Sequence, residues 1–85
     1  MKLNIYINRL VRDVEKKIGK KETMNLIGVK RMTIHRWKNN YYELSVDNLE
    51  HVCRKYVEVY PKEDLREVFM QGLIYLMEDR LKDKV

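Results

Sequence analysis

The stretch that decides the fold is residues 28–39, which read G-V-K-R-M-T-I-H-R-W-K-N. The glycine at its start marks a sharp break, because glycine adopts positive φ without steric cost. The run that follows has one narrow apolar edge, formed by Ile34 and Trp37 three residues apart. This spacing predicts a short helix from about Arg31 to Asn39, with Trp37 in the core. Most of the surface of that helix is expected to remain exposed.

Two helices are predicted before this stretch. The first runs from about residue 4 to 17, with Asn4 as its N-cap and Gly19 as its stop. The second is short, running from Lys20 or Lys21 to Ile27. Its end at residue 28 implies a turn of three or four residues into the next helix. Apolar residues at steps of three and four carry the first prediction: Leu3, Ile7, Leu10, Val14 and Ile18. In the second helix the inward-facing residues are expected to be Thr23, Met24 and Ile27.

Two helices are also predicted after it. Ser45 is the expected N-cap of a helix that ends near Tyr56. Pro61 is expected to be the first residue of a last helix, which extends from about Lys62 to Lys82, because proline lacks the amide proton that this position cannot use. The sequence therefore predicts an all-α fold: one five-helix domain over residues 1–85, with a central helix-turn-helix formed by the second and third helices and a long C-terminal helix over 61–83.

The last helix carries two apolar seams, and one suffices for the core of a domain this short. Gly72 lies in the first seam and suggests close approach of another backbone there. The second seam would be left exposed on a monomer, which is typical of an interface. We therefore expect a homodimer through this helix, with an interface formed by Met70, Leu73, Ile74, Met77 and Leu81. The first seam is formed by Leu65, Phe69, Gly72 and Leu76.

Composition narrows the class of protein. The chain is 45% hydrophobic and 36% charged, as ordinary globular domains are. It has no apolar run long enough to span a bilayer and no signal-peptide layout, so a cytoplasmic location is expected. Cys53 is the single cysteine, which excludes an internal disulfide and a cysteine-rich zinc site. We expect Cys53 to lie in the core. The sequence indicates no cofactor. Catalysis has little support, because the only serine, Ser45, reads as a helix cap and no glycine-rich phosphate loop is present.

Charge is distributed unevenly along the chain. Residues 1–40 hold eleven Lys or Arg against three acids, a net charge of +8, whereas residues 41–85 carry −3. The excess positive charge thus belongs to the half that holds the exposed helix. Such polarity suits a polyanion on one side of the molecule.

The string L-I-G-V-K-R-M-T-I-H-R-W at residues 26–37 resembles the helix-turn-helix of the phage repressor and Cro class, which commonly reads G-V-S-x-x-T-I-x-x-W. The likeness covers roughly residues 20–56. The departures are Met24 in place of an alanine, Lys20 or Lys21 in place of a glutamine, and Lys30 in place of a capping serine. The residues that match are Ile27, Gly28, Val29, Thr33, Ile34 and Trp37.

This resemblance implies which side chains contact DNA. Arg31 and Arg36 would pair with guanine, Met32 would touch a thymine methyl, and His35 and Asn39 would donate to a base edge or phosphate. The expected phosphate contacts are Lys20, Lys21, Lys30 and Lys38, with Tyr41 and Tyr42 in the following loop.

The leading hypothesis is a small repressor-like regulator of phage or plasmid type that binds double-stranded DNA as a homodimer on a pseudo-palindromic site. One alternative keeps DNA binding but assigns it to a DNA-packaging, recombination or replication component. The other is a protein-binding helix-turn-helix module, an antirepressor or inhibitor whose basic face meets an acidic protein.

Overall fold

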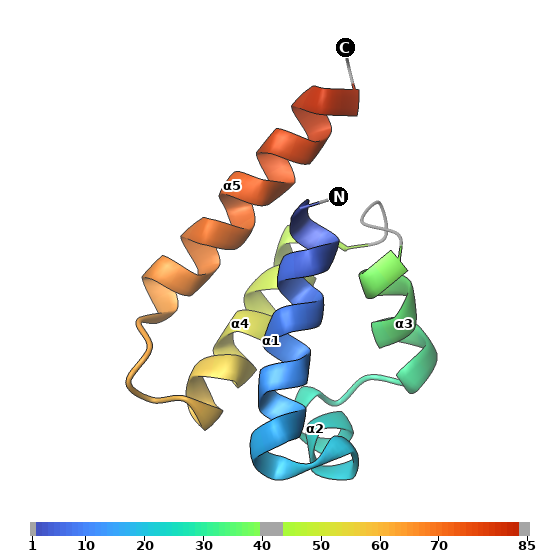
Figure 1. Cartoon of the computed structure of the whole chain (residues 1–85), viewed down its shortest axis with the longest axis vertical. Helices are drawn as coiled ribbons and strands as arrows, with labels where there is room; N and C mark the ends of the chain where they lie inside the picture. Colours follow the sequence, from blue (N-terminus) through green and yellow to red (C-terminus); the bar gives the residue numbers. More distant parts are fainter. Residues whose placement is uncertain (1, 40–43, 84–85) are drawn as a thin grey trace.

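The computed structural model describes the backbone of residues 2–39 and 44–83, and the side chains of 2–37 and 44–82. Within these ranges the chain forms five α-helices and no strand, so the predicted all-α, five-helix fold is confirmed (Figure 1). The helices are α1 (Lys2–Ile18), α2 (Lys20–Ile27), α3 (Arg31–Asn39), α4 (Val46–Val59) and α5 (Leu65–Asp83). No helix in the described ranges is long and apolar enough to cross a membrane.

Helix α1 is the centre of the molecule, because it packs against all four other helices. Figure 1 shows α5 on one side of α1 and the α2–α3 pair on the other. Its predicted apolar stripe is buried except at Ile18, which is half-buried, and Leu3 and Ile7 are wholly inaccessible to solvent. Leu49 and Cys53 of α4 are equally inaccessible and complete the centre of the core. The predicted core position of Cys53 is thus confirmed.

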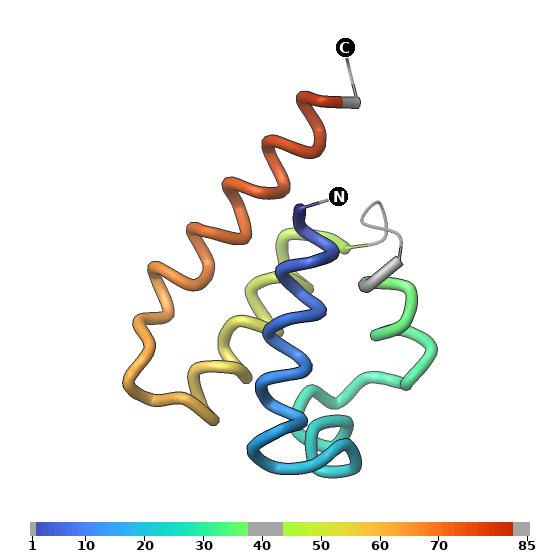
Figure 2. The backbone as a smooth tube through the Cα atoms, viewed as in Figure 1, coloured from blue at the N-terminus to red at the C-terminus, as the bar shows by residue number. Residues whose placement is uncertain are grey.

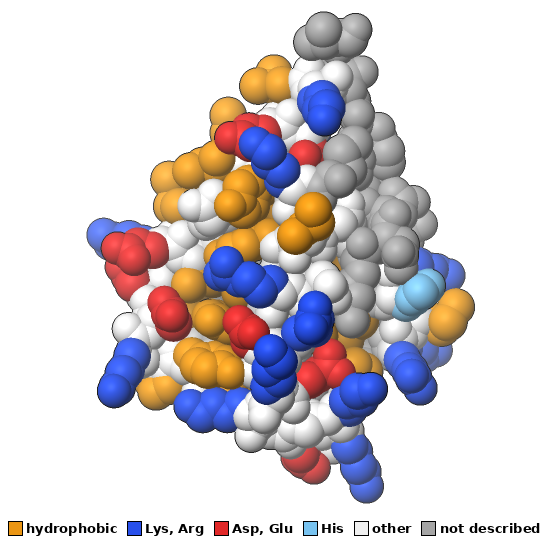
Figure 3. Space-filling view, viewed as in Figure 1, with side chains coloured by type: hydrophobic (Ala, Val, Ile, Leu, Met, Phe, Trp, Pro, Cys, Tyr) orange, Lys and Arg blue, Asp and Glu red, His pale blue; other side chains and the backbone are white. Residues whose placement is uncertain are grey.

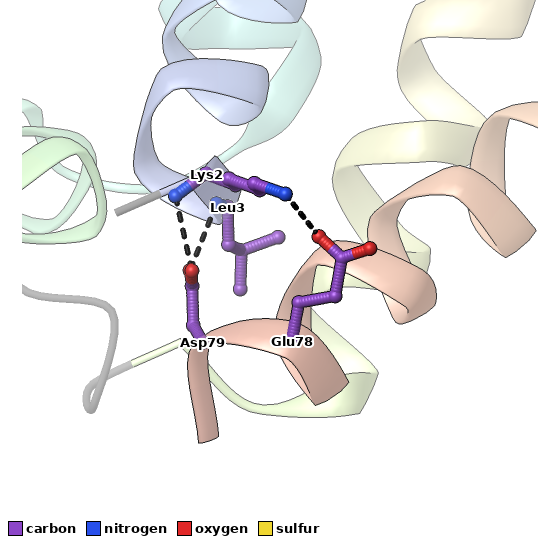
Figure 4. A network of polar contacts seen from close by, with 4 residues as sticks. All are labelled: Lys2, Leu3, Glu78 and Asp79. Carbon is purple, nitrogen blue, oxygen red and sulfur yellow. Dashed lines mark hydrogen bonds and ion pairs between the residues drawn. The ribbon is translucent and has the colours of Figure 1, made fainter. Parts of the chain in front are cut away.

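The start of α1 differs from the prediction. The helix begins at Lys2, and Asn4 lies buried inside its first turn instead of capping it. The cap comes from the far end of the chain: the carboxylate of Asp79 on α5 accepts hydrogen bonds from the backbone N–H groups of Lys2 (3.1 Å) and Leu3 (3.0 Å), as Figure 4 shows. The side chain of Lys2 pairs with Glu78 at 2.6 Å, and this hydrogen bond raises the pKa of the lysine. Two amide groups of the first turn that lack a partner within the helix are therefore bonded by a distant residue, which sequence periodicity does not identify.

Two glycines make the sharp turns that bracket α2 (Figure 2). Gly19 has φ 87° and ψ 160°, a conformation that is essentially restricted to glycine. Gly28 has φ 74° and ψ 23°, the left-handed conformation that commonly ends helices. The predicted stop at Gly19 and the positive φ expected at Gly28 are both confirmed. Within α2, Thr23 and Ile27 are buried and Met24 is half-buried.

The connection between α4 and α5 corrects two predicted boundaries. Helix α4 is capped by Ser45 as expected, since its hydroxyl accepts from the N–H of Asn48 at 3.1 Å, but it continues to Val59. Pro61 does not begin the last helix. It follows Tyr60 in a turn closed by the hydrogen bond from Glu63 N–H to the Tyr60 carbonyl (3.0 Å), and proline favours this second position of a turn.

Helix α5 starts later, at Leu65, because Asp64 provides the acceptors for its first turn. The Asp64 carboxylate accepts from the N–H of Arg66 (3.1 Å) and its carbonyl from the N–H of Val68 (3.0 Å). An aspartate that accepts in this way is a strong N-cap, which explains why the prediction at Lys62 was wrong.

Gly72 lies where α5 meets α4. A Cβ atom at this position would lie 2.7 Å from Cδ1 of Leu49. The close approach predicted at Gly72 therefore exists, but the neighbour is a buried side chain and not another backbone. Val68 and Leu76 are buried on the same face of α5.

Candidate nucleic-acid interface

Helices α2 and α3 follow each other through a short turn, as the predicted helix-turn-helix requires. The N–H of Gly28 donates to the Met24 carbonyl (2.8 Å) and closes α2. The Lys30 carbonyl then accepts from the N–H groups of Thr33 (3.0 Å) and Ile34 (3.3 Å), which places Lys30 at the N-cap of α3. Only residues 28–30 separate the two helices, so the direction of α3 is set by this short turn.

Helix α3 is attached to the core by its predicted apolar edge. Ile34 is 2% exposed and Trp37 is 3% exposed, which confirms both as core residues. A polar contact reinforces this attachment, because the Nδ2 amide of Asn4 donates to the backbone carbonyl of Trp37. Helix α1 thus holds α3 through packing and through a buried hydrogen bond at the C-terminal part of α3.

A hydrogen bond from α4 stabilises the turn between α2 and α3. Nε2 of His51 lies 2.6 Å from the carbonyl oxygen of Ile27, the last residue of α2. Because a carbonyl only accepts, the hydrogen bond requires the proton to be on Nε2. Sequence reasoning missed this role of His51, since nothing in the spacing of α4 points to a carbonyl 24 residues earlier in the chain.

The opposite surface of α3 faces solvent. Arg31, His35 and Arg36 are all exposed, and Met32 has 64% of its surface accessible. Four of the five predicted base-contacting residues therefore share the outer surface of one helix. The fifth, Asn39, ends α3, but its side chain lies outside the described residues.

The structure describes the side chains of only some of the predicted phosphate-contacting residues. Lys20 and Lys21 are exposed in the first turn of α2, and Lys30 is exposed at the turn. The predictions for the side chain of Lys38 and for Tyr41 and Tyr42 lie outside the described residues. Figure 3 shows Lys and Arg side chains clustered over the end of the molecule formed by α2 and the adjoining end of α1.

A cleft of about 420 Å³ joins these two groups of residues at the junction of α1, α2 and α3. Its basic lining residues come from both motif helices, Lys20 and Lys21 from α2 and Arg31 and His35 from α3, against a single acid, Glu15. The tertiary structure thus brings predicted phosphate-contacting and base-contacting residues to one concave surface. Met24 and Ile34 complete its lining.

Within the described ranges, no group of three or more His, Cys, Asp or Glu is placed to hold a metal ion.

In comparisons with known proteins, no family model matches this chain, and no curated protein or solved structure matches it.

Proposed function

We propose that this protein binds double-stranded DNA in a sequence-specific manner, with α3 in the major groove, and acts as a repressor-like transcriptional regulator. The observation that carries the proposal is the division of α3 into a narrow buried edge and a broad exposed surface. Ile34 and Trp37 form the buried edge, while Arg31 and Met32 belong to the exposed surface. A helix that enters a groove needs this division, because its reading side chains must project beyond the body of the domain.

The exposed side chains of α3 have the chemistry of base readers. Arg31 and Arg36 are suited to bidentate hydrogen bonds with guanine, and His35 supplies a further donor to a base edge or phosphate. Met32 offers an apolar contact for a thymine methyl group. Asn39 is assigned to the same set from its place at the end of the helix.

The surrounding cations are suited to fixing the domain on the phosphate backbone. Lys20 and Lys21 line the same cleft as Arg31, and Lys30 is exposed at the turn before α3. The net charge of +8 in residues 1–40 attracts the N-terminal half of the chain, which includes α3, to a polyanion such as DNA. Lys38, Tyr41 and Tyr42 are further phosphate contacts in the proposal.

The test is a binding selection from random duplex DNA, repeated at several salt concentrations. We expect one recovered motif, and we expect Arg31→Ala to lose the preference for guanine at one position of that motif at a cost of about 1–3 kcal/mol. Lys20→Ala should weaken binding to all sequences alike and reduce the slope of log K against log salt by about 1. Arg66→Ala on α5 is the matched control, because Arg66 is also exposed but lies in another helix.

Two results would overturn the proposal. A selection that recovers no sequence above background would rule out sequence-specific DNA binding and favour a protein-binding role for the basic surface. Unchanged sequence preference in both Arg31→Ala and Arg36→Ala would show that α3 is not the reader.

A further inference from the structure

A second, smaller cleft lies between the C-terminal part of α1 and the start of α2. Its volume is about 250 Å³, and we call it the basic hollow. The residues that line it are all charged: Arg12, Glu15 and Lys16 of α1 and Lys20 of α2. Because Glu15 and Lys20 also line the larger cleft that contains Arg31, the two clefts adjoin each other. The DNA contacts predicted from the sequence do not include Arg12 or Lys16.

The α1 cations of the basic hollow have no partner within the protein, unlike other cations of the same helix. Arg9 lies over the ring of Tyr6, 5.3 Å from its centroid, and Lys17 lies over the ring of Tyr60 at 4.7 Å. In the part of the chain that the structure describes, the two α1 cations of the basic hollow form no ion pair, hydrogen bond or ring contact, not even with Glu15 beside them. Their charge is therefore available to an external anion.

The chemistry of the basic hollow suits a phosphate backbone better than a protein surface. Protein interfaces have apolar and aromatic side chains at their centre and are depleted of lysine. No apolar residue is among the described residues that line the basic hollow. Lysine and arginine are instead the side chains that contact DNA phosphates most often. The hollow also adjoins the cleft of Arg31, which belongs to the helix proposed to enter the major groove.

We propose that Arg12 and Lys16 contact phosphates of the DNA strand beside the groove that α3 enters. This inference rests on the proposed function and extends the DNA-binding surface from the helix-turn-helix to α1. The two residues lie on successive turns of α1, about 6 Å apart along its axis. Each can therefore meet its own phosphate, since the phosphates of one strand rise by about 3.4 Å per nucleotide. Neither residue reads sequence, because phosphate contacts position a protein without identifying bases.

Glu15 provides a test of opposite sign. It is the only acid among the described residues that line the two clefts, so its carboxylate lies close to the phosphates in this arrangement. Like charges repel, and a unit charge about 6 Å away in water changes affinity by about threefold. Glu15→Gln should therefore bind every duplex sequence about threefold more tightly. Glu67→Gln on α5 removes the same charge from an exposed position and should leave the affinity unchanged. Unchanged affinity in Glu15→Gln would contradict the proposal.

The main test compares two double variants that remove the same charges from the same helix. Arg12→Gln/Lys16→Gln empties the basic hollow of its α1 cations, whereas Arg9→Gln/Lys17→Gln removes the two that lie over tyrosine rings. All four side chains are exposed, so both variants should keep the helical circular dichroism of the wild type. Binding to the duplex that the wild type selects is measured over a range of salt concentrations.

We expect only the first double variant to lose phosphate contacts. In about 0.1 M salt its affinity should fall by about 10- to 100-fold, and the slope of log K against log salt should decrease by about 2, because each contact releases about one counterion. The second double variant should keep the wild-type slope. Ethylation of single phosphates locates the contacts: one or two phosphates should, when ethylated, weaken binding of the wild type but not of Arg12→Gln/Lys16→Gln.

Three results would overturn the inference. Equal losses in the two double variants would show that the charges act only at long range, and would leave the proposed function intact. A changed sequence preference in Arg12→Gln/Lys16→Gln would show that these residues do not contact phosphates alone. A wild type that binds no duplex at any salt concentration would overturn both this inference and the proposed function, and would favour an acidic protein as the partner of the basic hollow.

Discussion

The side-chain amide of Asn4 donates a hydrogen bond to the backbone carbonyl of Trp37, joining α1 to α3 across 33 positions of sequence. Asn4 is 9% exposed and Trp37 is 3% exposed, so water does not readily replace this bond. It lies on the side of α3 that faces the core, opposite the exposed surface assigned to DNA. The position of the proposed reading helix is therefore coupled to the first turn of the chain.

Substitution of Asn4 should be costly for this reason. We expect Asn4→Ala to lower the free energy of unfolding by about 1–3 kcal/mol, because it leaves a buried carbonyl without a partner. Urea denaturation followed by circular dichroism measures the change. Asn25→Ala on the exposed surface of α2 serves as the control and should unfold close to the wild-type midpoint. Equal midpoints for the two variants would contradict the role given to Asn4.

The two neighbouring acids of α5 should behave differently. Asp79 is 2% exposed and accepts two backbone hydrogen bonds from the start of α1, so Asp79→Ala should destabilise the fold by about 2–3 kcal/mol. Glu78 forms an ion pair with Lys2 at the surface, so Glu78→Gln should leave the thermal midpoint nearly unchanged. Thermal unfolding of both variants measures the two midpoints, and we expect the lower one for Asp79→Ala. A larger loss in Glu78→Gln than in Asp79→Ala would refute the assignment of Asp79 as the cap of α1.

Gly28 provides a test of backbone conformation without a packing effect. Apart from the adjoining residues of the chain, no atom lies within 4 Å of a Cβ built at this position, so a loss in Gly28→Ala comes from its φ of 74°. We expect a loss of about 1–2 kcal/mol for Gly28→Ala, since a side chain in the left-handed conformation is strained. Gly28→Asn should lose less, because asparagine tolerates this conformation. Urea denaturation of the two variants is the measurement, and we expect Gly28→Asn to have the higher midpoint. A higher midpoint for Gly28→Ala would exclude backbone strain as the cause of the loss.

Stability should fall in alkaline solution. Burial raises the pKa of the Cys53 thiol from 9.0 to about 12, so the unfolded chain releases this proton at a lower pH than the folded chain does. The unfolded state therefore binds fewer protons above pH 9.0, and the free energy of unfolding declines from there as pH rises towards about 12. Burial also raises the pKa of Tyr6 to about 12, which adds a second decline above pH 10.0.

A comparison with Cys53→Ala isolates the contribution of the thiol. Urea midpoints of both proteins from about pH 7 to about pH 11 should converge as pH rises, because only the wild type loses the thiol contribution. The decline that Tyr6 produces remains in both. Midpoint curves that stay parallel across this range would rule out a raised pKa at Cys53.

Local patterning predicted the helices well. Apolar residues at steps of three and four located α1, Gly28 located the turn, and Ile34 and Trp37 located the inner edge of α3. Ser45 capped α4 as expected. These features depend on residues within one or two turns of each other, where a single helix determines which side chains share a face.

Helix ends were less predictable where competing caps were present. Pro61 and Asp64 both carry helix-start signals, and Asp64 begins α5 because its carboxylate and its carbonyl accept within the first turn, whereas Pro61 occupies a turn. Gly72 correctly indicated a close contact, but the partner, Leu49, was identifiable only once α4 and α5 were packed.

For the candidate interface, the sequence by itself determined which residue types α3 exposes and which two side chains it buries. Only the tertiary structure decided that Lys20, Lys21 and Arg31 share one cleft, that His51 holds the turn, and that α1 is capped from 77 positions away. The physical reason is the distance along the chain over which each interaction acts. Helical periodicity and glycine conformation act between neighbours in the chain, whereas these hydrogen bonds exist only after packing has removed water from groups that no sequence spacing relates.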